Sequence, residues 1–165
     1  MYRIVAPFVA VLIPVIALAQ QPAPPGDPSK HTGKEASKVY VPGLEQFMNM
    51  ILIEHNKLWF AAQARNWLLA DYELGEIKEI MGDVQDLVPT FKNLPLADML
   101  DAVVTKEIAA LEKSIETKDY KAFTTGYDKL TQACNACHQG TGNGFVVIKR
   151  PTQPAFTNQD YRPRN

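Results

Sequence analysis

The sequence is poor in cysteine and carries almost no excess of charge of either sign. Only two cysteines occur in 165 residues, which excludes a small domain held together by a framework of disulfides. Lys and Arg together number 17 against 18 Asp and Glu, which gives a formal net charge of -1. A nucleic-acid-binding protein needs a basic surface that releases phosphate counterions. We therefore expect no nucleic-acid partner.

Proline is scarce in the middle of the chain, although the whole sequence contains 12. Because proline breaks the interior of a helix, a long stretch that nearly lacks it allows long helices. No segment shows the sustained alternation of hydrophobic and polar residues that is typical of strands. Hydrophobic residues make up 46% of the chain, which is enough for an ordinary core and too many for a disordered protein. The composition predicts an all-α domain.

The start of the chain, residues 1–19, has the features of a secretory signal peptide. Arg3 gives a positive start, an uncharged apolar run from Ile4 to Leu18 follows, and Ala17-Leu18-Ala19 offers a small-x-small cleavage pattern. The run is too short and too broken by proline for a membrane span, which needs about 20 apolar residues. We predict cleavage after Ala19, export to the periplasm and no stable membrane insertion afterwards. The alternative is an uncleaved N-terminal anchor.

Two proline-rich segments flank the predicted domain. Residues 20–41 read as an extended, flexible leader, because proline favours extended chain over helix. Residues 143–165 read as an extended tail that also contains Phe156 and Tyr161. We predict that this tail wraps across the domain as a strap and uses its aromatic side chains as anchors.

Between these segments, residues 42–142 carry four stretches in which hydrophobic residues recur every three or four positions, as on one face of a helix. The predicted helices run from about Leu44 to Ala64, Trp67 to Val88, Pro95 to Ile115 and Tyr120 to Gln139. Asn66 and Asp119 are good N-caps for the second and the fourth. The links within the first pair and within the second pair are short, so each pair forms an antiparallel hairpin. The predicted fold class is an antiparallel four-helix bundle.

The residues that carry chemistry are Cys134-Asn135-Ala136-Cys137-His138. They match the C-x-x-C-H pattern for attachment of a c-type haem. That attachment needs two thiols at the two vinyl groups of the porphyrin edge and an adjacent imidazole at the iron. Positions i, i+3 and i+4 share one helical face, so Cys134, Cys137 and His138 point the same way. We predict one covalently bound haem c.

Three other interpretations of these residues compete with haem. A thioredoxin-like redox pair expects a strand before the motif and a βαβ unit. A structural disulfide between Cys134 and Cys137 is the second interpretation. A zinc site would need more Cys or His ligands than these positions provide. The helical context and the export signal favour haem.

The leader, the bundle and a C-x-x-C-H motif in the last helix together resemble the class II cytochromes c, the family of cytochrome c′ and its methionine-ligated relatives. The resemblance covers about Val41 to Gln139. It implies that Cys134 and Cys137 form the thioethers and that His138 is the proximal iron ligand. It also implies a protein that is not an enzyme and that carries single electrons between periplasmic redox proteins. Besides redox proteins, the partner we predict is a second copy of the chain in a homodimer.

The ligand at the sixth position of the iron would decide the mechanism. In the class II arrangement the first helix faces the distal side, where His55 and Met48 are the candidate ligands. A histidine ligand would give a centre of lower potential than a methionine ligand. Alternatively, Met48 is ordinary core, and His55 is hydrogen-bonded to a carbonyl or a haem propionate. An open iron would then make the protein a gas-binding or gas-sensing haem protein.

Two cations, Lys57 and Arg65, are candidate partners for the haem propionates. The alternative for both is an ordinary solvated position on the helix surface. Peroxidase-like catalysis would need several acid-base groups over an open iron. The sequence offers only His55 for that role, so this function is not favoured.

Overall fold

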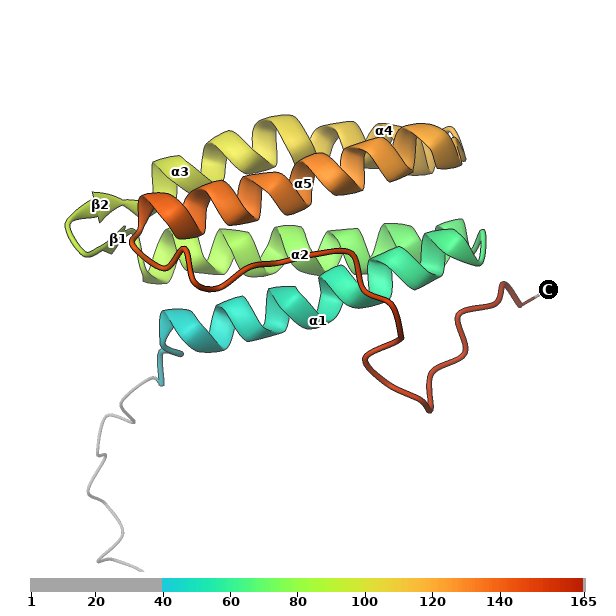
Figure 1. Cartoon of the computed structure of the whole chain (residues 1–165), viewed down its shortest axis with the longest axis horizontal. Coiled ribbons are helices and arrows are strands. Elements are labelled where there is room, and N and C mark those ends of the chain that lie inside the picture. Colours follow the sequence, from blue (N-terminus) through green and yellow to red (C-terminus); the bar gives the residue numbers. More distant parts are fainter. Residues whose placement is uncertain (1–39, 165) are drawn as a thin grey trace, which may run out of the picture. The chain divides into compact units, whose positions relative to one another are not determined.

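The computed structural model describes residues 40–164, which form an all-α unit of four helices packed antiparallel (Figure 1). The predicted fold class is confirmed. The predicted signal peptide over residues 1–19, and nearly all of the leader over 20–41, lie outside the described residues. Within residues 40–164, no helix has both the length and the hydrophobicity that crossing a membrane requires.

The elements follow one another in a simple up-and-down order. Helices α1 and α2 span Leu44–Gln63 and Trp67–Leu87. A small hairpin follows, in which β1 (Thr90–Phe91) pairs antiparallel with β2 (Leu94–Pro95). The third of the four packed helices consists of three consecutive pieces: α3 (Leu96–Val103), a π-helical turn (Val104–Ile108) and α4 (Ala109–Glu116). The last helix, α5, spans Tyr120–Gly140.

The predicted helix starts are confirmed in their chemistry. The Asn66 Oδ1 atom accepts a hydrogen bond from the Leu69 amide at 3.2 Å. The Asp119 Oδ1 atom accepts from the amides of Lys121 and Ala122, each at 3.0 Å. These side chains satisfy backbone donors that have no partner within the helix.

The sequence did not predict the hairpin, because its strands are only two residues long. Its turn is formed by Lys92 and Asn93, whose φ angles are 50° and 64°. Two successive residues in the left-handed region are what a tight two-residue hairpin turn requires. The hairpin closes one end of the bundle beside the end of α5 (Figure 1).

The predicted third helix is interrupted by the π-helical turn. Its hydrophobic residues include Leu96, Leu100 and Ile108, all buried, at spacings that are multiples of four. Because an α-helix turns about 100° per residue, each four-residue step overshoots a full turn by about 40°. A π-helical turn is wider than an α-helical turn and takes up this excess. Leu111 and Ile115 beyond it are therefore buried in the same core.

The core is filled differently in the two halves of the bundle. In the half near the α1–α2 and α4–α5 turns, aromatic rings pack together: the ring centroids of Trp59 and Tyr127 are 4.9 Å apart, and those of Phe123 and Tyr127 are 5.9 Å apart. We call this the closed half. In the half near the hairpin and the end of α5, the side chains surround a cavity. We call this the cavity half.

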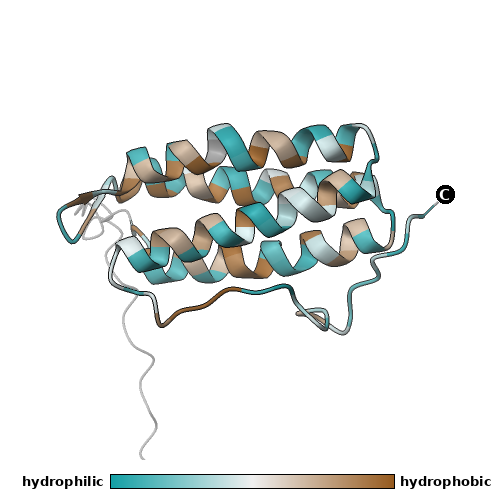
Figure 2. Ribbon diagram, turned by 45° about the horizontal axis from the view of Figure 1, so that its top comes forward, coloured by the Kyte–Doolittle hydropathy of each residue, from teal (hydrophilic) through white to brown (hydrophobic). Residues whose placement is uncertain are grey.

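After α5 the chain turns back and runs along the bundle (Figure 1, Figure 2). We call residues 145–161 the strap. The Asn56 side chain donates to the Gln153 carbonyl at 3.1 Å and accepts from the Ala155 amide at 2.8 Å. The tail therefore runs along the bundle as predicted, but only one of its two predicted aromatic anchors is buried. Tyr161 is buried, whereas Phe156 is 42% exposed.

Candidate functional site

The cavity of the cavity half has a volume of about 610 Å³. Cys134, Cys137 and His138 all line it from α5. The structure thus brings the three motif residues to one wall, as their spacing predicts. Hydrophobic side chains from the other elements line much of the rest, including Leu44, Met48, Ile51, Met81, Leu96 and Leu100. A hydrophobic space of this size with a few polar groups is typical of cofactor sites.

The two thiols in this wall are free and partly buried. Burial raises the pKa of Cys134 from 9.0 to about 11 and also raises the pKa of Cys137. Both side chains are therefore neutral thiols near pH 7. A thioredoxin-like redox pair needs the opposite, a thiol whose pKa is lowered so that it reacts as thiolate. The raised thiol pKa values are not those of a thioredoxin-like pair. The motif also lies within α5 and does not follow a strand, as such a pair would.

The structure also gives no support to a disulfide or to a zinc site at the motif. The structure has Cys134 and Cys137 as separate thiols. Among residues 40–164, no three His, Cys, Asp or Glu side chains come together in a way that could hold a bare metal ion.

Among residues 40–164, one ring nitrogen of His138 has a hydrogen-bond partner and the other has none. Its Nδ1 lies 2.8 Å from the Val146 carbonyl oxygen. A carbonyl can only accept, so Nδ1 carries a proton, and in the neutral ring Nε2 then has the lone pair. Metal-binding histidines use this arrangement, in which a carbonyl orients the ring and the other nitrogen binds the metal.

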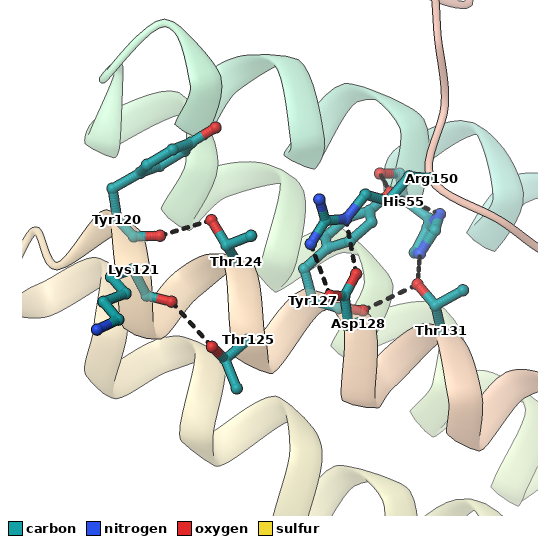
Figure 3. A network of polar contacts seen from close by, with 9 residues as sticks. All are labelled: His55, Tyr120, Lys121, Thr124, Thr125, Tyr127, Asp128, Thr131 and Arg150. Carbon is teal, nitrogen blue, oxygen red and sulfur yellow. Dashed lines mark hydrogen bonds and ion pairs between the residues drawn. The ribbon is translucent and has the colours of Figure 1, made fainter.

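The start of the strap lies along α5 at the motif. Asn135 makes two hydrogen bonds to Ile148: its Oδ1 accepts from the Ile148 amide at 2.7 Å, and its Nδ2 donates to the Ile148 carbonyl at 2.8 Å. Arg150 makes a double hydrogen bond to Asp128, at 2.7 and 2.6 Å (Figure 3). The sequence pattern does not single out Asn135, because its partner Ile148 lies 13 residues away.

His55, the candidate distal ligand, lies in the cavity wall with both ring nitrogens engaged (Figure 3). Its Nδ1 is 2.9 Å from the Tyr127 hydroxyl, and its Nε2 is 3.0 Å from the Thr131 hydroxyl. Burial lowers the pKa of His55 from 6.5 to about 4, so the ring is neutral. The structure thus has His55 as a hydrogen-bonded core residue. A bond from its Nε2 to iron would have to replace the Thr131 contact.

Two methionines line the cavity. Met48, the second candidate for the distal position, is half-buried on α1. Met81 on α2 is buried and lines the same cavity. Sequence reasoning missed Met81 as a candidate, because its place in the regular hydrophobic seam of α2 predicts only a core residue.

The two candidate propionate partners have other partners. Lys57 Nζ lies 2.7 Å from a Glu54 carboxylate oxygen, and the Arg65 guanidinium lies 3.5 Å from the centre of the Tyr120 ring. Neither cation lines the cavity.

A cation that sequence reasoning did not single out, Lys92, lies close to the cavity wall. Its Nζ donates to the Thr141 carbonyl at 3.0 Å and to Asn143 Oδ1 at 3.2 Å, and both of these residues line the cavity. Lys92 belongs to the hairpin turn, so only the tertiary structure brings it here.

Away from the cavity, the strap covers a buried carboxyl group. Glu73 on α2 accepts a hydrogen bond from Gln159 at 3.3 Å. Its other oxygen lies 3.4 Å from Lys57 Nζ but makes no hydrogen bond. Burial raises the pKa of Glu73 from 4.5 to about 7. This carboxyl group therefore exchanges its proton near neutral pH.

The site as a whole joins two thiols, an oriented imidazole and a large hydrophobic space. This set can tether and ligate a flat hydrophobic metal cofactor, and its neutral thiols are ill-suited to redox exchange. Comparisons with known proteins add no relative: no family model matches the chain, and neither the curated proteins nor the solved structures include a significant match.

Proposed function

We propose that this chain is a monohaem c-type cytochrome that carries single electrons. In this proposal Cys134 and Cys137 bind haem c covalently, and His138 is the proximal iron ligand. The observation that carries it is the cavity of about 610 Å³ with both thiols and His138 in one wall. The likeness to the class II cytochromes c in helix number and motif position supports the same conclusion.

The chain's own residues suit each part of such a site. The two thiols are close to the cavity and neutral, and His138 is already oriented by the Val146 carbonyl. Much of the cavity wall is hydrophobic, and the polarity of the surroundings is one means by which a protein sets the potential of a haem. When bound, haem c would supply an iron that accepts and releases one electron.

Export and partners belong to the same proposal. The predicted signal peptide would deliver the chain to the periplasm, where its partners would be redox proteins. The mass of the mature protein tests export, because cleavage after Ala19 predicts an N-terminus at Gln20. Size-exclusion chromatography with light scattering tests the expected homodimer.

A second function, capture of a small gas, is favoured by the partners of His55. Since both of its ring nitrogens are hydrogen-bonded, the distal position would be left to Met48, Met81 or no protein ligand at all. Without a methionine ligand, the iron would be open to carbon monoxide or nitric oxide.

The optical spectrum of the protein, matured with haem and then reduced, tests the proposal and separates the two functions. Haem that stays with the protein in acid–acetone shows covalent attachment. Sharp α and β bands that carbon monoxide does not change would indicate six-coordinate iron and electron transfer. A broad merged band that shifts with carbon monoxide would indicate open iron and gas binding. Protein that matures without covalent haem would overturn both.

A further inference from the structure

The strap meets α5 at three regularly spaced points. Val146, Ile148 and Arg150 contact His138, Asn135 and Asp128, in that order. The first two contacts are made by backbone groups of the strap and the third by the Arg150 side chain, so the strap runs back along α5 with its backbone held against the motif. Val147, which lies between the first two of these strap residues, is 70% exposed.

Asn135 is the central point of this contact. Its carboxamide both accepts from the amide and donates to the carbonyl of Ile148. A carboxamide is the side chain that can supply a donor and an acceptor side by side. Both backbone groups of Ile148 are thereby fixed. The Val146 carbonyl, only two residues away, is held against the His138 Nδ1 atom.

We propose that Asn135 is a positioning residue for the haem iron, acting through the strap. It holds Ile148 so that the Val146 carbonyl keeps its hydrogen bond to His138 and presents Nε2 to the cavity. The proposal rests on the proposed function, because it assigns a role to the strap at the proximal ligand. A histidine ligand that donates its second N–H to a carbonyl is a stronger base toward iron. Asn135 therefore favours the ferric state.

The chain offers a matched control in Asn56. Asn56 also grips the strap at two backbone points, the Gln153 carbonyl and the Ala155 amide. It lies on α1 and does not line the cavity. If Asn135 only fastens the strap, replacing either asparagine by alanine should change the reduction potential of the iron equally. The positioning role predicts an effect of Asn135 alone.

The experiment compares Asn135→Ala, Asn135→Asp and Asn56→Ala in the full chain. For each haem-loaded protein the reduction potential is measured. Loss of a partner that orients a metal ligand changes metal affinity about 10- to 100-fold. We expect Asn135→Ala to shift the ferric–ferrous equilibrium about tenfold toward ferrous, which is about 59 mV for one electron. Asn135→Asp, which keeps only the acceptor, should lie between, and Asn56→Ala should match the wild type.

A second readout needs no haem. Nitrogen NMR of the haem-free protein reports which ring nitrogen of His138 carries the proton. We expect Nδ1–H in the wild type and in Asn56→Ala, and a mixture of both forms in Asn135→Ala. This measurement decides the proposal even if the wild type binds no haem, a result that would refute only the proposed function. It also decides the proposal if Asn135→Ala folds but does not mature.

Two results would overturn the positioning role. One is an Asn135→Ala protein whose potential and His138 tautomer equal those of the wild type. The other is an Asn56→Ala protein that shifts them as much as Asn135→Ala does. If Asn135→Ala does not fold, the same comparisons with Asn135→Asp decide.

Discussion

The closed half and the cavity half of the bundle are built from the same helices but complete their cores differently. In the closed half the side chains Trp59, Phe123 and Tyr127 fill the space between the helices with rings. In the cavity half the same helices leave about 610 Å³. Protein interiors are otherwise packed like organic crystals. A bundle that closes one half and leaves the other hollow has room for a group that is not part of the chain.

The difference can be traced along one face of α5. Its early positions carry large buried side chains, Phe123, Tyr127 and Leu130. Its later positions carry smaller ones, including Ala133, Cys134 and Cys137, and these line the cavity. The change from large to small residues along a continuous helix opens the space where the thiols lie. The hollow therefore coincides with the groups that would hold a haem.

The largest expected effect comes from removing both thiols in the cavity half. The double variant Cys134→Ala, Cys137→Ala should lose all covalent haem, because no thiol remains to form a thioether. Extraction with acid–acetone checks this, with the wild type as control. Haem that stays covalently held in the double variant would contradict the assignment of the motif.

Truncations in the two halves should differ in cost in the haem-free protein. Phe123→Ala in the closed half should lower the free energy of unfolding by about 3–5 kcal/mol, since it leaves a new hole in a packed core. Leu100→Ala should cost about 2 kcal/mol or less, because Leu100 already borders the cavity and has fewer atoms around it. Urea unfolding measures both. Equal costs would show that the cavity half is as tightly packed as the closed half.

His55 lies where the two halves meet and should act through stability. The folded state lowers its pKa from 6.5 to about 4, so the unfolded chain binds the proton more tightly. Stability should fall by about 3 kcal/mol as pH drops from 6.5 to about 4, at about 1.4 kcal/mol per unit of pKa. His55→Gln should lose this pH dependence in urea unfolding, and in the haem-loaded protein it should leave the visible spectrum unchanged. A changed spectrum would instead make His55 an iron ligand.

Glu73, under the strap and outside the cavity, should show the opposite pH dependence to that of His55. Burial raises its pKa from 4.5 to about 7, so the folded state binds this proton more tightly than the unfolded chain does. Stability should fall by about 3 kcal/mol as pH rises from 4.5 to about 7, at about 1.4 kcal/mol per unit of pKa, and the nearby Lys57 already holds this pKa below the value that burial alone would give. Glu73→Gln should remove the decline in urea unfolding. A Glu73→Gln profile that still declines would place the titrating group elsewhere.

The sequence by itself determined what depends on short-range chemistry. The starts of α2 and α5 follow from Asn66 and Asp119, whose side chains cap amides two or three residues away. The common face of Cys134, Cys137 and His138 follows from their spacing, since helix geometry alone sets it. The seam of α2 and the two short turns follow in the same way. Each of these features needs only neighbours along the chain.

The tertiary structure alone decided what depends on residues far apart. The partners of His55 lie 72 and 76 residues away, and Asn135 finds the Ile148 backbone 13 residues away across a turn. A polar residue on a hydrophobic helix face is compatible with a hydrogen bond or with a metal ligand, and periodicity cannot choose between them. Only the packing of α5 against α1 brings the Tyr127 and Thr131 hydroxyls to that ring. For the same reason the cavity itself could not be predicted, because an empty volume belongs to several elements at once and to no segment of the sequence.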